Sequence, residues 1–471
     1  MGHYPYDAPE MDEAARRFRE GLAAEYARRF PRSKAWFEEG GKRVLDGTSH
    51  AIRWNEPFMP VTRKAEGPAI EDIDGHCMPD FWQGHFANLH GHNPRLIRET
   101  LVDTLLDGRG LQSGMIHEVE GEVAALICEM TGMETVRLTT SGSLGTFYAM
   151  MLARAFTGRD RVLKVAGGWH GSQPFGLKGV HLHGGSFDHV ESEGLWSGAG
   201  EEIALTRFND VDDLRRAFSK IGDRIACFAV EPVLGAGGGM VATPEYLREA
   251  RALTEKHGAL LLSDEIITAF RFRPGDCAAL YGVRPDLLIL GKVLGGGMPV
   301  AAVAGRRDVL DLCTRASARV KFEGGTYSAH ELSLVAARVQ LRHLRDRPDE
   351  VYGRLADLGR YAREGLALVA ADAGVPIRIL GVSPEALPRS SLVMWYVARD
   401  DRPAASCPEE MSERIHPRIG ERLLKSVLLL EGVSVRSGLG AISTAHGEAD
   451  LDAAFEATAA ALARFRAAGL V

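Results

Sequence analysis

The sequence predicts an α/β fold, a mostly parallel sheet flanked by helices, with a smaller α+β lobe at the C-terminal end. The first observation is that, from Arg95 onward, short apolar runs rich in β-branched residues alternate with helical stretches. Strands that alternate with helices at this spacing favour a parallel sheet covered on both faces. The second is a shift, after about residue 335, toward long helices rich in Ala, Leu and Arg, which indicates a separate lobe.

The chain of 471 residues is long for a single core and has room for about three domain-sized units. We expect an N-terminal segment of helices and a hairpin over residues 1–85 that joins the small domain, a large domain over residues 86–335, and a small C-terminal domain over residues 336–471. Hydrophobic residues make up 45% of the chain and charged residues 25%, which is ordinary for a folded globular protein.

The N-terminal segment begins with a predicted amphipathic helix over residues 11–30, because its large apolar residues from Phe18 to Phe30 fall four apart among charged residues. A second short helix follows, and residues 69–81 read as a hairpin that turns at Asp74-Gly75. Asn93 and Pro94 are interpreted as the cap and the first residue of the next helix.

The remaining elements follow from the alternating pattern. Helices are predicted over residues 95–106, 117–131, 146–157, 332–345, 351–371 and 449–468. Strands are predicted over residues 135–139, 161–165, 225–230, 259–262, 287–290 and 300–304, and in the smaller lobe over residues 391–397 and 433–435.

Composition and cysteine usage argue against several classes of function. The formal net charge of −7 and the lack of a basic block argue against binding to nucleic acid or to a membrane. The six cysteines have no paired spacing, so neither a zinc site nor a disulfide framework is expected, and His85, His90 and His92 are interpreted as structural. No membrane span and no signal peptide are recognised, so we expect a cytoplasmic protein that acts on small molecules and needs no metal.

A lysine follows one of the predicted buried strands. Lys292 comes directly after the apolar run at residues 287–290 and is flanked by Gly291 and by glycines at positions 295–297. A partly desolvated ammonium has a lowered pKa, and its neutral form can hold an aldehyde cofactor as a Schiff base. A lone lysine at a strand end is more often a solvated one, so this interpretation needs support from other residues.

Two further segments place polar and aromatic residues beyond predicted strands, at the edge where parallel sheets bind ligands. Ser141-Gly142-Ser143 precedes a helix, where free N–H groups favour a phosphate; the alternative is a simple helix cap. Trp169 is placed to stack on a flat ring with His170 beside it; the alternative is a packed core tryptophan.

Carboxylates end two other predicted strands. Glu231 follows the run at residues 225–230, and Asp264 follows the run at residues 259–262. A buried aspartate is costly unless it meets a cation or a donor, and a pyridinium N–H supplies both. That contact would keep the ring protonated, so that it withdraws electrons from a deprotonated substrate carbon. Together with Lys292, these residues make a coincidence improbable.

At this point the motifs resemble those of pyridoxal-phosphate (PLP) enzymes of fold type I, the class III aminotransferases. The sequence is most similar to the branch of glutamate-1-semialdehyde 2,1-aminomutase and the β-phenylalanine-type transaminases, from about Pro31 to the end. The resemblance implies a seven-stranded sheet in a PLP-binding large domain, with Lys292, Asp264 and Trp169 taking part in catalysis. It assigns to cofactor binding Ser141, Gly142, Ser143, Trp169, His170, Glu231, Asp264, Ile266, Lys292 and Thr326.

The same resemblance implies a partner and a substrate contact. Gly324-Gly325-Thr326 resembles the segment whose threonine reaches the cofactor phosphate of the neighbouring subunit, which implies a homodimer with shared sites. Arg53 stands in the register of the aminomutase's carboxylate-binding arginine. From its residue type alone, Arg53 is equally suited to bind a substrate carboxylate or to pack its stem against the protein surface.

Several positions depart from the family pattern, and most of them lie on the substrate side. Leu144 and Ala236 replace a glutamate and an asparagine, His50 replaces a serine, and a glutamate near Ser437 is missing. These changes argue against glutamate-1-semialdehyde as the substrate. We expect an aminotransferase that acts on an α- or β-amino acid with one carboxylate and on a keto acceptor. The alternatives are an intramolecular 2,1-aminomutase and a non-catalytic binding protein on the same fold.

Overall fold

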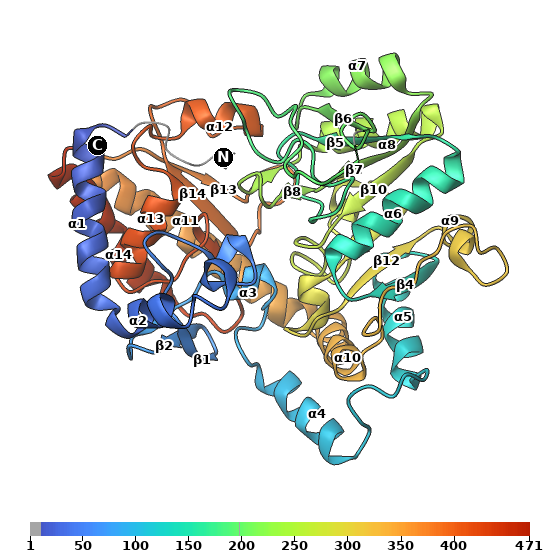
Figure 1. The fold of residues 1–471 in the computed structure, drawn as a ribbon, viewed down its shortest axis with the longest axis horizontal. Helices are drawn as coiled ribbons and strands as arrows, with labels where there is room; N and C mark the ends of the chain where they lie inside the picture. The colour runs from blue at the N-terminus through green and yellow to red at the C-terminus, as the bar shows by residue number, and fades with distance from the viewer. Residues whose placement is uncertain (1–10, 197) are drawn as a thin grey trace.

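The computed structural model describes residues 11–196 and 198–471. Its centre is a seven-stranded sheet with the strand order β4-β12-β11-β10-β7-β5-β6, in which only β12 runs antiparallel to its neighbours. The predicted fold class is thereby confirmed (Figure 1). The strands are β4 (Thr135–Thr139), β5 (Arg161–Val165), β6 (Ile203–Thr206), β7 (Ile225–Val230), β10 (Leu260–Asp264), β11 (Leu287–Leu290) and β12 (Ala301–Gly305).

The central strands are apolar at nearly every position because helices cover both faces of the sheet. Successive side chains of a strand point to opposite faces, so Cys227 and Leu287 pack in one layer while Phe228 and Leu288 pack in others. One layer contains α6 (Gly142–Thr157). The opposite layers contain α5 (Glu118–Thr131), α7 (Val211–Ile221), α8 (Pro244–His257) and α10 (Glu331–Asp346).

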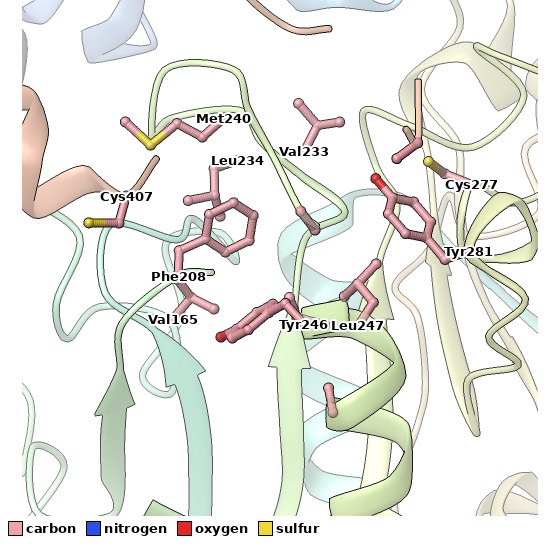
Figure 2. Close-up of a cluster of buried hydrophobic side chains, with 14 of the residues drawn as sticks. Val165, Phe208, Val233, Leu234, Met240, Tyr246, Leu247, Cys277, Tyr281 and Cys407 are labelled. Atoms are coloured by element: carbon pink, nitrogen blue, oxygen red, sulfur yellow. The ribbon is translucent and has the colours of Figure 1, made fainter. Parts of the chain in front are cut away.

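One of these hydrophobic clusters joins the large sheet to the C-terminal part of the chain. Figure 2 shows Tyr246 and Leu247 of α8 below Leu234 and Met240, with Cys407 of the C-terminal segment beside them. Leu234 and Met240 belong to a small hairpin of β8 (Val233–Leu234) and β9 (Met240–Val241). The hairpin that follows β7 is therefore fixed from two sides.

A second lobe surrounds an antiparallel sheet with the order β13-β14-β15. The N-terminal helix α1 packs into the core of this lobe, next to the C-terminal helix, although the two lie at opposite ends of the sequence (Figure 1). The elements are α1 (Glu13–Arg29), α11 (Arg354–Ala373), β13 (Ile377–Leu380), β14 (Leu392–Val397), α12 (Pro408–Arg414), α13 (Glu421–Leu430), β15 (Gly438–Ala441) and α14 (Glu448–Ala467).

Short elements connect the two lobes. The predicted hairpin is present as β2 (Ala69–Asp72) and β3 (Cys77–Pro79), and β1 pairs with its outer edge. The domain boundaries remain predictions. The connecting elements are α2 (Pro31–Glu39), η1 (Leu45–Gly47), η2 (Ala51–Arg53), β1 (Thr62–Glu66), α3 (Gln83–Phe86), α4 (Arg95–Leu106), η3 (Ala278–Tyr281), η4 (Lys292–Gly295), α9 (Arg307–Leu310), η5 (Asp311–Cys313) and the π-helical turn η6 (Asp349–Gly353).

Two strand predictions were incomplete or wrong. The run at residues 433–435 forms no regular strand; it makes a single bridge, in which Ser434 pairs with Asp80 beside β3. The third strand of this sheet is instead β15, which pairs with β14, and a Cβ atom at Gly438 would come within 2.5 Å of the Trp395 backbone. Glycine has a low strand propensity and valine a high one. Propensity therefore favoured the valines at residues 433–435 over the glycine-containing segment that forms β15.

The start of one helix and the cap of another also differ from prediction. Helix α6 begins at Gly142 and not at residue 146, because Ser141 caps it and accepts a hydrogen bond from the Leu144 N–H group. Pro94 occupies the cap position of α4 with extended backbone, and Asn93 before it has a φ of +49°. In the described part of the chain, no helix combines the length and apolar character needed to cross a membrane.

Candidate active site

A cavity of about 420 Å³ opens at the carboxyl ends of the parallel strands. Its walls come from the segments that follow β4, β5, β7, β10 and β11, so the sheet brings together residues that are far apart in the sequence. The predicted site residues that line it are Ser141, Gly142, Ser143, Trp169, His170, Glu231, Asp264, Ile266 and Lys292. Arg53 and Thr326 are not part of this lining.

One end of the cavity is the N-terminus of α6. The first N–H groups of a helix have no partner within the helix, and the helix dipole favours an anion there. Ser141 Oγ accepts the Leu144 N–H group at 3.4 Å, which leaves the preceding N–H groups of Gly142 and Ser143 at the cavity wall. Gly171 has a φ of +85°, and a Cβ atom there would lie 2.3 Å from Ser143 Oγ. Only glycine lets the Trp169 loop approach the helix start this closely.

A buried carboxylate forms the base of the cavity. Asp264 ends β10, is 5% exposed, and its Oδ2 atom lies 2.8 Å from Nδ1 of His170. The Ile266 N–H group donates to Oδ1 at 3.3 Å. A carboxylate can accept about four hydrogen bonds, so Asp264 keeps acceptor capacity for a ligand. His170 Nε2 is buried and has no partner among the described residues.

The loop that carries Trp169 is fixed by a second buried carboxylate. Glu231 Oε1 accepts the Trp169 N–H group at 2.8 Å, and Oε2 accepts the Gly235 N–H group at 3.0 Å. Burial raises the pKa of Glu231 above its usual range, and the nearby Asp264 charge adds to this. Glu231 therefore connects the turns that follow β5 and β7.

Sequence reasoning missed Lys164, which supports the same loop from inside β5. Its side chain is fully buried, and Nζ donates to the carbonyl groups of Gly168 (2.9 Å), Gly176 (3.2 Å) and Lys178 (2.7 Å). These three bonds use all three ammonium donors. The available signal was a lysine in an otherwise apolar strand, because a buried ammonium is costly unless its donors are satisfied.

Lys292 starts the turn directly after β11. Its φ is +47°, in the left-handed region that costs a non-glycine residue about 1–2 kcal/mol, and such strain is concentrated at functional sites. Burial lowers the pKa of the amine to about 8, although the charges of Asp264 and Glu231 oppose this shift. A pKa of about 8 leaves roughly a tenth of the amine in its neutral, nucleophilic form at pH 7.

Ile266 packs between the two ends of the cavity. A Cβ atom at Gly142 would lie 2.6 Å from Ile266 Cδ1, and one at Gly291 would lie 2.9 Å from the same atom. The isoleucine therefore occupies the space that the two glycines leave open. Ile266 also lines the cavity, and its role in cofactor binding, which the resemblance implies, stays a prediction.

Arg53 lies outside the cavity lining, in an exposed turn. Its Nε donates to Nε2 of His85 at 3.2 Å, and no carboxylate in residues 11–196 and 198–471 pairs with it. Burial and the Arg53 charge lower the pKa of His85 to about 3, so the ring is neutral and can accept this bond. The ring centroids of His50 and His85 are 5.3 Å apart, and α3, which carries His85, contacts the turn that begins at Lys292. The Lys292 charge contributes to the lowered pKa of both rings.

The family model described as aminotransferase class-III matches residues 51–382, which is more than half of the chain. The chain belongs to the class III aminotransferases. It is 36% identical to a glutamate-1-semialdehyde 2,1-aminomutase of Rhodopirellula baltica over 352 residues, which are 73% of this chain and 78% of the relative.

Solved structures agree with this assignment. A β-phenylalanine aminotransferase from Variovorax paradoxus has a TM-score of 0.82 and 26% identity, covering 96% of this chain and 98% of the other. A transaminase with PLP bound has a TM-score of 0.81 and 27% identity, covering 94% and 99%. This class III aminotransferase is a PLP-dependent enzyme of fold type I, as the sequence predicted.

The cavity residues fit PLP. The free N–H groups at the start of α6 suit its phosphate, and the buried carboxylate of Asp264 suits its ring nitrogen. Trp169 and Ile266 line the walls between them, where a flat ring would lie. The amine of Lys292 completes the set, because its lowered pKa suits reaction with an aldehyde.

The lowered pKa of Lys292 predicts how cofactor loading depends on pH. When PLP is added to apoenzyme, the loading rate should rise with pH and level off above about pH 8, because the neutral amine is then fully formed. Asp264→Asn should move this midpoint to lower pH, since the Asp264 charge raises the pKa of the lysine. Borohydride trapping and peptide mapping measure the rate at Lys292. A rate that still climbs beyond about pH 9 would indicate an ordinary lysine.

Proposed function

We propose that this enzyme is an aminotransferase that moves an amino group between a carboxylate-bearing α- or β-amino acid and a keto acceptor. The observation that carries the proposal is the position of Arg53. Its guanidinium donates to the neutral ring of His85 and pairs with no carboxylate of the residues that the structure describes. His85 belongs to α3, which contacts the turn η4 that begins at Lys292. Arginine binds carboxylates through paired, charge-assisted hydrogen bonds.

The cavity residues would hold the cofactor in a fixed orientation. When bound, PLP supplies the carbonyl group that receives the amino group and a ring that withdraws negative charge from the substrate carbon. The N–H groups of Gly142 and Ser143 would bind the phosphate, and Asp264, oriented by His170, would accept the ring N–H. Trp169 would cover one ring face and so exclude water.

Lys292 would move the proton. Its Nζ would take the proton from the substrate carbon that bears the amine, as general base, and would then return it as general acid. Groups with a pKa near the working pH are efficient in such transfers, and the pKa of about 8 meets that condition. Arg53 would hold the carboxylate so that this carbon–hydrogen bond faces Lys292.

A single binding arginine favours a substrate with one carboxylate. Arg436 is a second arginine whose charge lowers the pKa of His85, so it lies on the same side. It is already paired with Glu421, which also accepts the Ser437 N–H group at 3.2 Å. A paired arginine offers less to a second carboxylate than Arg53 does, because the protein carboxylate must first be displaced.

A second candidate is an aminomutase, which would return the amino group to a neighbouring carbon of the same molecule. The name of the Rhodopirellula baltica relative favours it. Two features of this chain favour the aminotransferase: Ala236 lines the cavity where the family often has asparagine, and His50 replaces a serine near Lys292. Both changes affect the substrate side.

Acceptor dependence distinguishes the two candidates. An aminotransferase given an amino donor alone should convert its cofactor once to the amine form and then stop, with repeated turnover only after a keto acid is added. Absorbance of the cofactor and product analysis measure this with a panel of α-, β- and ω-amino acids. Sustained turnover of a single substrate without acceptor would exclude transamination and support the aminomutase.

Arg53→Gln tests the substrate contact. A hydrogen bond to a charged group contributes about 1.5–3 kcal/mol, and each 1.4 kcal/mol changes a binding constant about tenfold. The KM of the Arg53→Gln variant for the amino acid should therefore rise about tenfold to a hundredfold. The KM for the matching amine, which has no carboxylate, should change less than about twofold, since this substrate makes no contact with Arg53. Arg63→Gln, at an exposed arginine of β1, is the matched control. Equal losses for both substrates would contradict the assignment.

We also propose a homodimer in which Thr326 reaches the neighbouring site. Thr326 is exposed, and its carbonyl oxygen accepts a hydrogen bond from Gln112 Nε2 at 2.5 Å. The same surface exposes large apolar side chains, which soluble monomers rarely gather. They are Leu106 (80% exposed), Leu111 (61%), Met115 (78%), Ile116 (89%) and Tyr327 (60%). Leu106 ends α4, which projects from the body of the molecule (Figure 1), and Leu111, Met115 and Ile116 follow it. Tyr327 is next to Thr326 in the sequence.

Charged substitutions in this surface test the dimer. Met115→Asp combined with Ile116→Asp should convert the dimer to a monomer. Dimer formation would then bury two unpaired carboxylates on each chain, which is costly. PLP affinity should fall by about tenfold or more, since each phosphate would lose a charge-assisted bond from Thr326 of the second copy. Light scattering and cofactor titration measure both effects. Leu368→Asp, at a 67% exposed leucine of α11, is the control. A monomeric wild-type enzyme would refute the proposal.

A further inference from the structure

A hairpin between β5 and β6 carries imidazole and carboxylate groups that the proposed reaction does not use. Its two arms pair through a bridge between Lys178 and Val190 and a second bridge between His183 and Ser186. Side chains two residues apart on an arm share one face. His181 and His183 therefore share a face of one arm, and Glu191 lies on the other arm within reach of both rings.

The ligand-type atoms of these three residues already lie together. His181 Nδ1 is 2.7 Å and His183 Nε2 is 3.2 Å from Oε2 of Glu191, and all three lie within 4.8 Å of one another. Atoms bound to a tetrahedral zinc ion at about 2.0–2.2 Å are roughly 3.3–3.5 Å apart. Small side-chain rotations would open the cluster to this spacing.

We propose that His181, His183 and Glu191 bind one divalent transition-metal ion, Zn²⁺ before others. Two imidazoles and a carboxylate form a donor set that suits Zn²⁺ and related ions and does not suit Ca²⁺ or Mg²⁺. Three protein ligands leave a fourth position for water or for another side chain. The exposed ring of His189 lies nearby, with its centroid 4.2 Å from that of the His183 ring.

The carboxylate is oriented as metal-binding carboxylates usually are. Glu191 Oε1 accepts the N–H groups of Val180 (3.1 Å) and His181 (2.8 Å), which fixes the side chain and leaves Oε2 directed at the two rings. Such supporting hydrogen bonds hold ligands in place and are part of a built site. The rings of His181 and His183 are partly exposed, so an ion can enter from solvent.

The hairpin is connected to the loop that carries Trp169. The Gly167 N–H group donates to the Gly179 carbonyl at 2.8 Å, and Lys164 Nζ donates to the Lys178 carbonyl. A metal ion that joins the two arms would therefore stabilise the support of the Trp169 loop. Because the ligands lie outside the cavity lining, the role is structural, and the sequence expectation that no metal is needed would be wrong.

Metal binding to the PLP-loaded enzyme tests the proposal. After dialysis against a chelator, added Zn²⁺ should bind at one ion per chain and raise Tm. Added Co²⁺ should give visible absorption bands typical of a low-symmetry, four- or five-coordinate site, at longer wavelength than the cofactor absorbance. Glu191→Gln and His183→Ala should each weaken binding by more than about 100-fold, which exceeds the loss of a supporting residue. Cofactor absorbance should be unchanged, which shows that the variants fold.

A matched control separates a metal site from an ordinary histidine–carboxylate pair. His76 Nδ1 lies 2.9 Å from Asp72 Oδ2, without a third ligand. His76→Asn should bind Zn²⁺ as the wild-type enzyme does. Absence of stoichiometric Zn²⁺, or variants at Glu191 and His183 that bind like wild type, would show that the three residues form only a hydrogen-bonded cluster and would overturn the proposal.

Discussion

The constraint on which the site depends is the burial of charge at the carboxyl edge of the sheet. Asp264 ends an apolar strand and is 5% exposed, where an unpaired carboxylate is costly. The ring of His170, 2.8 Å away, meets part of that cost and leaves acceptor capacity toward the cavity. The same burial lowers the pKa of Lys292 to about 8. One environment thus prepares both the carboxylate for a ring N–H and the amine for an aldehyde.

The loop around Trp169 shows how the surrounding fold maintains that environment. Loops usually contact solvent, yet this one is held from two sides by buried ionisable groups, Lys164 in β5 and Glu231 after β7. Lys164 donates to backbone carbonyl groups and Glu231 accepts from backbone N–H groups, which would otherwise lack hydrogen-bond partners. If Trp169 stacks on the cofactor ring as proposed, it needs a rigid support, because cofactor orientation determines which substrate bond is cleaved. The positions of these two side chains are therefore as important to the site as the tryptophan itself.

The sequence predicted the parts of this site that follow from periodicity. Apolar runs fixed where strands end, and polar residues at those ends, such as Lys292 and Asp264, converge for topological reasons. The acceptor for Arg53 was missed, because His85 is 32 positions away and was interpreted as structural. Lys164 was missed because its partners are backbone carbonyl groups, which every residue carries, so no residue type in the sequence indicates them. Strand β15 was missed because Gly438 is required by close contact with Trp395 and Gly440 by close contact with Phe81, and not by strand propensity.

This difference explains why family motifs specify the cofactor better than the substrate. The cofactor end depends on backbone N–H groups, glycine spacing and buried charges. Leu144 can replace a family glutamate while the helix start is kept, because the backbone N–H groups do not depend on that side chain. The proposed substrate end would depend on exposed side chains on short turns, of which Arg53 and His50 are examples. Exchanging such side chains costs little stability, since exposed positions carry little packing energy. Substrate choice can therefore change within the family while the chemistry stays the same.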